Sequence, residues 1–351
     1  MPELFLTIFF ISILLFFLGS GIWVAISMVG VSAIGMMLFT SRPVGDAMAT
    51  TIWGTSSSWT LTALPLFVWM GEILFRTKLS ENLFAGLSPW MQKLPGGLIH
   101  VNVVGCALFA AISGSSAATV ATVGKMSIPE LRKRKYPEKI LLGSLAGSGT
   151  LGLLIPPSII LIIYGVTVQE SIAKLFIAGI IPGIMIALIF MSYVIIWSLI
   201  NKKSMPKYVE NFSFLEKIKK SKQLLPVIIL ISAVIGSIYT GVATATEAAS
   251  LGVVGALILS YFQKSLTIKT FKQSLLGATK TSCMIAFILA GSTFLSLAMG
   301  FTGLPRNLAI WIQNMELSPY VLIFVLMIFY IILGMFLDGI SAVVLTMAII
   351  E

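Results

Sequence analysis

Residues 147–158 of the chain read GSGTLGLLIPPS, and they lie inside a longer apolar segment at 140–164. Glycine and serine weaken a helix, and two adjacent prolines remove two backbone donors and obstruct the preceding turn. A second interrupted stretch, SGSSAATVATVG at 113–124, lies in the apolar segment before it. Backbone groups freed in an apolar environment must be satisfied by protein, water or a ligand. The two stretches therefore predict broken helices in a membrane protein.

The composition points to the same solvent. Of the 351 residues 58% are hydrophobic and only 10% are charged, whereas a soluble domain carries about 25% charged residues. Apolar runs predict spans at about 4–18, 21–39, 61–75, 140–164, 173–200, 224–239, 247–262 and 281–300. We therefore expect an all-α polytopic membrane protein that lies in a lipid bilayer.

Two further apolar segments, 98–128 and 320–351, are interrupted by small polar residues. Each of their arms has about 13–15 residues, which is too few to cross about 30 Å of hydrocarbon. We expect both segments to be re-entrant helical hairpins. Reading 98–128 as two short spans gives the same distribution of charge between the two sides, so that alternative stays open.

The basic residues indicate the orientation. The net charge of +10 could suggest a nucleic-acid partner, but the basic residues lie in short loops between apolar spans. When loops are counted alternately, all of the 23 Lys and Arg residues except Arg42, Lys174 and Arg306 fall on one side. Because cytoplasmic loops carry the excess of Lys and Arg, the sequence predicts a multi-pass membrane protein with its N-terminus outside the cytoplasm and no nucleic-acid partner.

The two halves of the chain resemble each other weakly. At an offset of 220 residues, 21–39 aligns with 241–259, with glycines or alanines matching at three positions, and a slightly larger offset aligns Gly114, Ser116 and Ala117 with Gly339, Ser341 and Ala342. The loop counts place the two copies in opposite orientations, as in many secondary transporters. We predict a first inverted repeat at 1–200, which includes hairpin 98–128 and broken helix 140–164, and a second at 224–351.

Residues 201–223 join the predicted repeats. Their basic side chains interleave with Phe212, Phe214, Leu215 and Ile218, as in an amphipathic helix that lies at a membrane interface. We expect a cytoplasmic amphipathic connector, and a simple solvated linker is the alternative.

The interrupted stretches could bind ions. The amino end of a half-helix favours an anion and the carboxyl end favours a cation, and hydroxyl groups at 115, 116, 119, 122 and 150 add oxygen ligands suited to sodium. Small residues in membrane helices can equally serve close packing. Two such stretches in adjacent elements, one of them with a double proline, favour a binding site.

The motifs carry a family resemblance. The run SGSSAATVATVGKMSIPELRKRKYP at 113–137 and the run GTLGLLIPPSIILIIYG at 149–165 resemble the large membrane subunit (DctM) of the tripartite ATP-independent periplasmic (TRAP) transporters. FIAGIIPGI at 176–184, GVATATEAAS at 241–250 and FLDGISAVVLT at 336–346 fit the same pattern. The resemblance implies sodium-coupled import of an organic acid, such as a C4-dicarboxylate or sialic acid, by an elevator mechanism. It also implies a small four-helix membrane subunit (DctQ-like) and a periplasmic solute-binding protein (DctP-like) as partners, and no cofactor beyond Na⁺ as the coupling ion.

The resemblance also assigns roles to residues. It implies a first sodium site at Ser115, Ser116, Thr119, Gly149 and Thr150, and a second in the other hairpin at Asp338, Gly339 and Ser341. For the substrate it implies contacts at Ser116, Pro156, Pro157, Ser158, Arg306 and Asp338. Arg306 could instead anchor a loop to lipid headgroups, and Asp338 could be an interfacial acid. We expect Glu247 to cap its own helix.

The sequence departs from the family pattern in two places. Ala245 stands before the TEA motif where the family usually has proline. The repeat offset also predicts a counterpart of GTLGLLIPPS near 370–382, beyond Glu351, so we expect the second repeat to be incomplete and this chain not to transport by itself.

Other classes of function fit the sequence less well. The alternative within the same class is a single-component, sodium- or proton-coupled anion transporter. An intramembrane enzyme would need a nucleophile with a base, or metal ligands, at membrane depth. His100 is the only histidine, and we expect it to be an interfacial polar residue. A membrane scaffold would not need two hairpins with broken helices, so a transporter that is not an enzyme is predicted.

Overall fold

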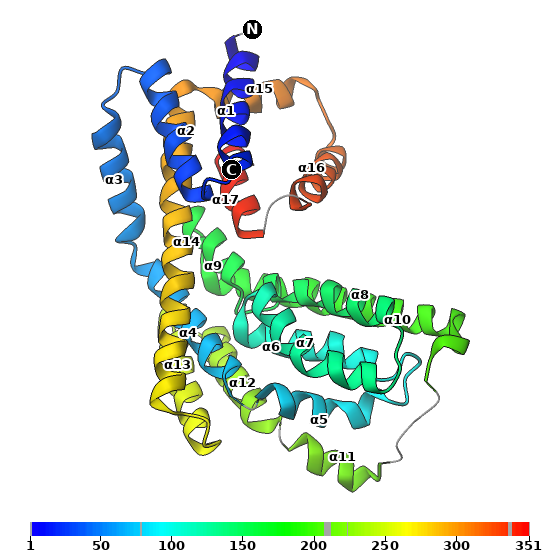
Figure 1. The fold of residues 1–351 in the computed structure, drawn as a ribbon. Helices are drawn as coiled ribbons and strands as arrows, with labels where there is room; N and C mark the ends of the chain where they lie inside the picture. The colour runs from blue at the N-terminus through cyan, green and yellow to red at the C-terminus, as the bar shows by residue number, and fades with distance from the viewer. Residues whose placement is uncertain (1, 78, 207–211, 223, 336–338, 351) are drawn as a thin grey trace. The chain divides into compact units, whose positions relative to one another are not determined.

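The computed structural model describes residues 2–77, 79–206, 212–222, 224–335 and 339–350, and all regular structure in these ranges is helical (Figure 1). Three of the described helices are each long and apolar enough to cross a membrane, and two bent helix pairs raise that number to five. The expected all-α polytopic membrane fold is therefore confirmed.

The chain forms two compact units, each of which draws on both halves of the sequence. Unit 1 combines Met1–Leu61, Ile163–Glu170 and Ser282–Glu351, and unit 2 combines Thr62–Ile162 and Ser171–Thr281. Two helices have one end in each unit: α9 (Ile159–Thr167) and α14 (Ile268–Thr302). We describe each unit by itself.

Unit 1 contains the first helices and the last helices of the chain. Its helices are α1 (Pro2–Gly19), α2 (Val24–Phe39), α3 (Val44–Ser56), α15 (Leu304–Asn314), α16 (Pro319–Gly334) and α17 (Gly339–Ile350), with the 3₁₀ turn η1 (Trp59–Thr62) at its border. Small residues let these helices approach closely, as expected in membrane packing. Gly291 of α14, for example, lies against the Ala25 carbonyl and the Met28 side chain of α2.

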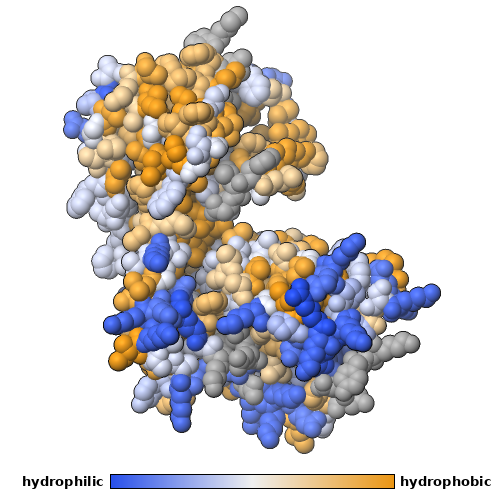
Figure 2. Space-filling view, in the orientation of Figure 1, coloured by the Kyte–Doolittle hydropathy of each residue, from blue (hydrophilic) through white to orange (hydrophobic). Residues whose placement is uncertain are grey.

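Unit 2 contains the hairpin predicted at 98–128 and the helices around it. Its elements are α4 (Ala63–Phe75), α5 (Leu79–Met91), α6 (Ile99–Ser113), α7 (Ser116–Lys133), α8 (Glu138–Gly149), η2 (Thr150–Leu153), α10 (Ile172–Ile200), η3 (Lys202–Ser204), α11 (Phe214–Ser221), α12 (Leu225–Tyr239) and α13 (Ala245–Phe262). Helices α6 and α7 run side by side as a hairpin with α8 against both, and α13 packs along α4 (Figure 1). In the space-filling view, hydrophilic residues gather at several places on the surface of this unit (Figure 2).

Three helices occupy stretches that the sequence analysis left as loops. They are α3, at 44–56, α5, at 79–91, and α15, at 304–314. None has a long apolar run, because polar residues are spread along α3 and both α5 and α15 are amphipathic. The search for apolar spans therefore passed over all three.

The connector contains the expected amphipathic helix. Ser213 and Glu216 form a capping box at the start of α11, which satisfies two amides at the helix start. The helix docks on α5 through Trp90, whose indole N–H donates to the Ser221 hydroxyl (2.8 Å) and whose ring meets Phe214 edge to face. Leu215 is 77% exposed on the outer side.

Candidate functional site

The hairpin turns at a single left-handed residue. Gly114 ends α6 with φ +58° and ψ +9°, and Ser115 then caps α7 by accepting from the Ala118 amide at 3.5 Å. A left-handed backbone at this position favours glycine because it has no Cβ. The SGSS sequence thus reverses the chain between two helices without a longer loop.

Hydroxyl groups close this turn. The Ser113 and Thr119 hydroxyls lie 2.9 Å apart. Both also donate to the Ser115 carbonyl, Thr119 at 2.7 Å and Ser113 at 3.2 Å. Because the Thr119 amide reaches the same carbonyl (3.0 Å), the backbone conformation of the hairpin tip is fixed by its own side chains.

The helix after the hairpin is interrupted where the sequence contains glycine and proline. Helix α8 ends at Gly149, η2 follows, and α9 begins at Ile159. Pro156, Pro157 and Ser158 are all buried in the gap. The Ser158 hydroxyl donates to the Leu153 carbonyl (2.6 Å) and accepts from the Leu161 amide (3.5 Å), so this serine joins the two half-helices.

The hairpin tip and the break are in direct contact. The Ile159 amide donates to the Gly114 carbonyl at 3.2 Å. A Cβ on Gly114 would lie 2.6 Å from the Pro157 carbonyl oxygen, and a Cβ on Gly152 would lie 2.8 Å from the Ser115 carbonyl carbon and oxygen. The structure therefore brings together the two stretches that the sequence analysis selected, backbone against backbone.

Neighbouring helices hold this arrangement through further glycines. On α10, a Cβ on Gly179 would lie 2.8 Å from the Leu154 carbonyl oxygen, and one on Gly183 would lie 2.9 Å from the Ile155 side chain. Their four-residue spacing is that of a small-residue packing face. On α4, Gly71 meets the Ser113 backbone in the same way, at 3.0 Å. The glycines of FIAGIIPGI thus support the break.

The first set of predicted ligands lies together at this contact. Ser115 and Ser116 are half-buried at the start of α7, and Thr119 is fully buried one turn later. Gly149 lies against Val120 and the Ser116 carbonyl. The exposed Thr150 donates its hydroxyl to the Gly147 carbonyl (2.7 Å). Neither stretch contains a charged residue before Lys125, so a cation held there by these two stretches would meet neutral oxygens.

The second set of predicted ligands belongs to unit 1. Gly339 opens α17, and Ser341 in the same helix is buried. The Ser292 hydroxyl of α14 donates to the Val344 carbonyl (2.6 Å) and ties α17 to that helix. Arg306 is exposed on α15. Asp338 lies outside the described residues, so its role stays a prediction.

A polar ladder between α6 and α8 was missed by the sequence analysis. The Asn102 amide donates to the Ser144 hydroxyl (3.0 Å) and the Leu141 carbonyl (3.2 Å), and the Ser148 hydroxyl reaches the Asn102 carbonyl (3.4 Å). The four-residue spacing of Ser144 and Ser148 was the available signal. His100, which we expect to be an interfacial polar residue, is fully buried on α6 with Nε2 2.8 Å from the Pro95 carbonyl oxygen. Its depth in the membrane stays a prediction.

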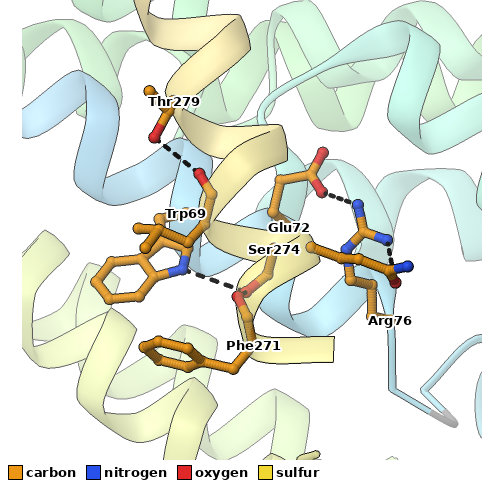
Figure 3. A network of polar contacts seen from close by, with 8 residues as sticks. Trp69, Glu72, Arg76, Phe271, Ser274 and Thr279 are labelled. Atoms are coloured by element: carbon orange, nitrogen blue, oxygen red, sulfur yellow. Dashed lines mark hydrogen bonds and ion pairs between the residues drawn. The ribbon is translucent and has the colours of Figure 1, made fainter. Parts of the chain in front are cut away.

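A second polar network joins α4 to the first part of α14 (Figure 3). Arg76 donates to the Glu72 carboxylate (2.9 Å) and to the Gln273 side chain (3.4 Å). Trp69 donates to the Ser274 hydroxyl (3.3 Å). A Cβ on Gly277 would lie 2.5 Å from a Glu72 carboxylate oxygen. The absence of a side chain at Gly277 therefore leaves room for this carboxylate.

The loop between α7 and α8 contains two fixing contacts. The Arg132 guanidinium donates to the Glu138 carboxylate at 2.6 Å, and this hydrogen bond lowers the pKa of Glu138 below its usual range. The Tyr136 hydroxyl accepts from the Leu98 amide at 3.0 Å, and burial raises the pKa of Tyr136. The base of the hairpin is therefore tied at both of its ends.

The fold and the site define a class of protein. A multi-pass helical membrane protein with a helical hairpin packed against a broken helix is typical of membrane transport proteins, and this is the class that the fold and the site indicate. The family comparison is specific: residues 10–351 match the family described as "Tripartite ATP-independent periplasmic transporter, DctM component", and the chain belongs to that family. It is the large permease component of such a transporter and not an enzyme.

Curated relatives agree with this assignment. The chain is 32% identical over 317 residues to the C4-dicarboxylate TRAP transporter large permease protein DctM of Pseudomonas aeruginosa, which covers 90% of this chain and 73% of the relative. It is 30% identical to the sialic acid TRAP transporter large permease protein SiaM of Vibrio cholerae (93% and 76% covered). It is 29% identical to the isethionate TRAP transporter permease protein DctMQ of Oleidesulfovibrio alaskensis, with 94% of this chain and 52% of the relative covered.

Proposed function

We propose that this chain is the permease subunit through which a sodium-coupled TRAP transporter imports a small organic acid. The observation that carries the proposal is the backbone contact between the hairpin tip and the broken helix around Gly114, Gly152 and Ile159. Two half-helices that meet at a fixed point present ends of opposite polarity, and the carboxyl end favours a cation whereas the amino end favours an anion.

The first sodium site lies at this contact in our proposal. Ser115, Ser116, Thr119, Gly149 and Thr150 offer hydroxyl and carbonyl oxygens, the ligands that hard cations prefer. The second site would lie around Asp338, Gly339 and Ser341, where the carboxylate would offset the charge of the ion. The exposed hydroxyl of Thr150 and the half-buried positions of Ser115 and Ser116 support the first site, because an arriving ion can reach them.

The substrate is an organic anion in our proposal. The names of the relatives include C4-dicarboxylate, sialic acid and 2,3-diketo-L-gulonate. As proposed substrate contacts we name Ser116, Pro156, Pro157 and Ser158 in unit 2, and separately Arg306 and Asp338, which belong to unit 1. The relative named DctMQ supports a small four-helix membrane subunit as one partner, and a periplasmic solute-binding protein would deliver the substrate.

Two inverted repeats and an elevator motion complete the proposal. The helices α1, α2, α4, α5 and hairpin α6–α7 have the same order along the chain as α12, α13, α14, α15 and pair α16–α17. Gly21 (φ +80°) and Gly241 (φ +71°) precede α2 and α13 at equivalent positions. With the charge distribution of the loops, this order supports repeats at 1–200 and 224–351 around a connector at 201–223. The protein would lie in the bacterial inner membrane with its N-terminus in the periplasm.

Reconstituted uptake tests the proposal. The complete complex of permease subunit, small membrane subunit and binding protein would be placed in liposomes with an inward sodium gradient, and uptake of labelled succinate, sialic acid and a keto acid would be measured. We expect uptake of one of these acids that requires both sodium and the binding protein. Uptake that continues with choline in place of sodium would refute the coupling ion, and uptake without the binding protein would refute the tripartite arrangement.

A further inference from the structure

Unit 2 contains a large cavity beside the carboxyl-terminal part of hairpin helix α7. It has a volume of about 760 Å³ and lies among α4, α5, α7, α11 and the start of α14. On α7 its lining begins at Thr122, six residues or about 9 Å beyond Ser116. The cavity therefore lies apart from the contact between the hairpin tip and the broken helix.

Two buried hydrogen-bond donors at this cavity have no acceptor among the residues that the structure describes. The Thr122 side chain is 97% buried, since only 3% of it is exposed, and among the described residues its hydroxyl has no partner. The Nε–H of Arg76 is also buried and lacks a partner in the described part of the chain. Buried polar groups are normally satisfied, so two such groups on one cavity indicate a ligand that brings acceptors.

The charge of the lining has the sign that such a ligand needs. Four basic residues line the cavity, Arg76, Lys125, Arg134 and Lys220, with Glu130 as the one acid of the lining in the described ranges. Glu130 pairs with Arg134 (3.8 Å), and Glu72 behind the lining pairs with Arg76 (2.9 Å). Among the described residues, these four cations and two carboxylates leave a charge of about +2, which an anion would balance.

Two of the cationic groups, Arg76 and Lys220, are held in place. The Glu72 carboxylate and the Gln273 side chain fix the Arg76 guanidinium (Figure 3). Lys220 lies over the Phe212 ring, with its ammonium nitrogen 3.9 Å from the ring centroid. Groups held before a ligand arrives cost less conformational entropy on binding. Eleven of the 17 lining residues are polar or charged, which suits a small polar solute better than a lipid chain.

We propose that this cavity is a second anion site, which holds a carboxylate group of a small organic acid on the cytoplasmic side of the hairpin. Thr122 and Arg76 donate to the carboxylate oxygens, and Lys125 and Lys220 supply the balancing charge. The proposal rests on the proposed function for the class of ligand and for the side of the membrane. It does not need the sodium sites.

Binding of succinate without sodium tests the proposal. The purified full chain would be dialysed against labelled succinate in a choline buffer, as wild type and as the variants Thr122→Val and Lys125→Gln. We expect the wild type to bind and each variant to bind about tenfold more weakly, because each loses one bond to a charged group. No binding by the wild type, or unchanged binding by both variants, would overturn the proposal.

Two controls on the same helix separate the site from the fold. Ser127→Ala removes another buried hydroxyl that has no partner among the described residues and does not line the cavity, and Lys133→Gln removes an exposed charge outside it. Both should bind succinate as the wild type does. Equal weakening in these controls would show a general effect and overturn the proposal.

A further experiment with two lipids tests whether the anion in the cavity is a solute or a lipid headgroup. Succinate binding would be compared in nanodiscs of phosphatidylcholine and of phosphatidylglycerol. A solute site predicts equal affinities, whereas tenfold weaker binding in phosphatidylglycerol that disappears in Lys125→Gln would show a lipid headgroup in the cavity and overturn the proposal. If succinate still bound without sodium but uptake did not depend on sodium, only the proposed sodium coupling would be contradicted, and the anion site would stand. A failure of the anion site can therefore be distinguished from a failure of the proposed function.

Discussion

The contact between Gly152 and the hairpin tip gives a sharp test of the candidate sodium site. In Gly152→Ala, the new Cβ would lie 2.8 Å from the carbonyl carbon and oxygen of Ser115 and 2.9 Å from the Ser116 amide nitrogen. Carbon atoms in good contact lie about 3.5–4.0 Å apart. Because all three neighbouring atoms are backbone, η2 and the hairpin tip must separate by about 0.7 Å or more.

The free-energy cost of this separation can be estimated to an order of magnitude. Overpacking a tight site costs about 1–3 kcal/mol, and if that cost falls on the sodium-binding arrangement, the affinity drops about 5- to 150-fold. When the ligand concentration is 100 times the dissociation constant, binding raises the free energy of unfolding by about 2.7 kcal/mol. After a 100-fold loss of affinity the same sodium concentration would stabilise the protein by only about 0.4 kcal/mol.

Thermal unfolding in detergent measures this difference. Melting curves of wild type and Gly152→Ala would be recorded in sodium chloride and in choline chloride at equal ionic strength. We expect sodium to raise the melting temperature of the wild type and to have much less effect on the variant. Gly143→Ala is the matched control, because Gly143 is exposed in the preceding helix α8 and a Cβ there meets nothing within 4 Å. A variant that keeps the full sodium effect would refute the reasoning, as would a control that loses it.

Three further changes test the surroundings of the site. Gly179→Ala places a Cβ 2.8 Å from the Leu154 carbonyl oxygen and should lower the melting temperature by several degrees, whereas an unchanged value would show that α10 does not hold the break. Glu138→Gln removes a carboxylate whose pKa is lowered by Arg132. Such a group stabilises the fold above its ordinary pKa and loses that contribution as the pH falls through its pKa in the folded state. The variant should therefore have a slightly lower melting temperature at pH 7, and its melting temperature should fall less than that of the wild type below about pH 4. Parallel plots of melting temperature against pH for the two proteins would contradict this. Tyr136→Phe removes the hydroxyl that accepts from the Leu98 amide at the start of α6. Hydrogen exchange at that amide, measured by mass spectrometry, should become faster. Exchange as slow as in the wild type would count against the contact.

The sequence was sufficient for the parts of the site that depend on local backbone chemistry. SGSS predicts an interruption because glycine allows the left-handed turn, and Gly114 has φ +58°. LLIPPS predicts another because proline cannot continue a helix, and the chain between η2 and α9 is not helical. These outcomes depend on a few adjacent residues, which is why a reading of one sequence could find them.

Contacts between distant segments could not be predicted in this way. Trp90 and Ser221 are 131 residues apart, and nothing in either segment indicates its partner. The ladder from Asn102 to Ser144 depends on how two helices lie side by side. The short helices α3 and α5 lack the apolar length that identified the spans, so their helical character follows from their packing and not from hydropathy.

The glycines of the site bear on a choice that the sequence left open, between close packing and ligand binding. Gly114, Gly152 and Gly179 are all used for packing, because a Cβ on each would meet backbone within 3 Å. Packing of this kind fixes the positions of carbonyl and amide groups, and a site built from backbone oxygens needs groups that are already fixed. The two interpretations are therefore not exclusive: tight packing at these glycines is the physical condition under which the ends of the half-helices can hold an ion. It follows that substitutions at Gly114, Gly152 or Gly179 should disturb stability and sodium binding together. A change at Thr150, whose exposed hydroxyl donates to the Gly147 carbonyl in its own turn, should separate the two.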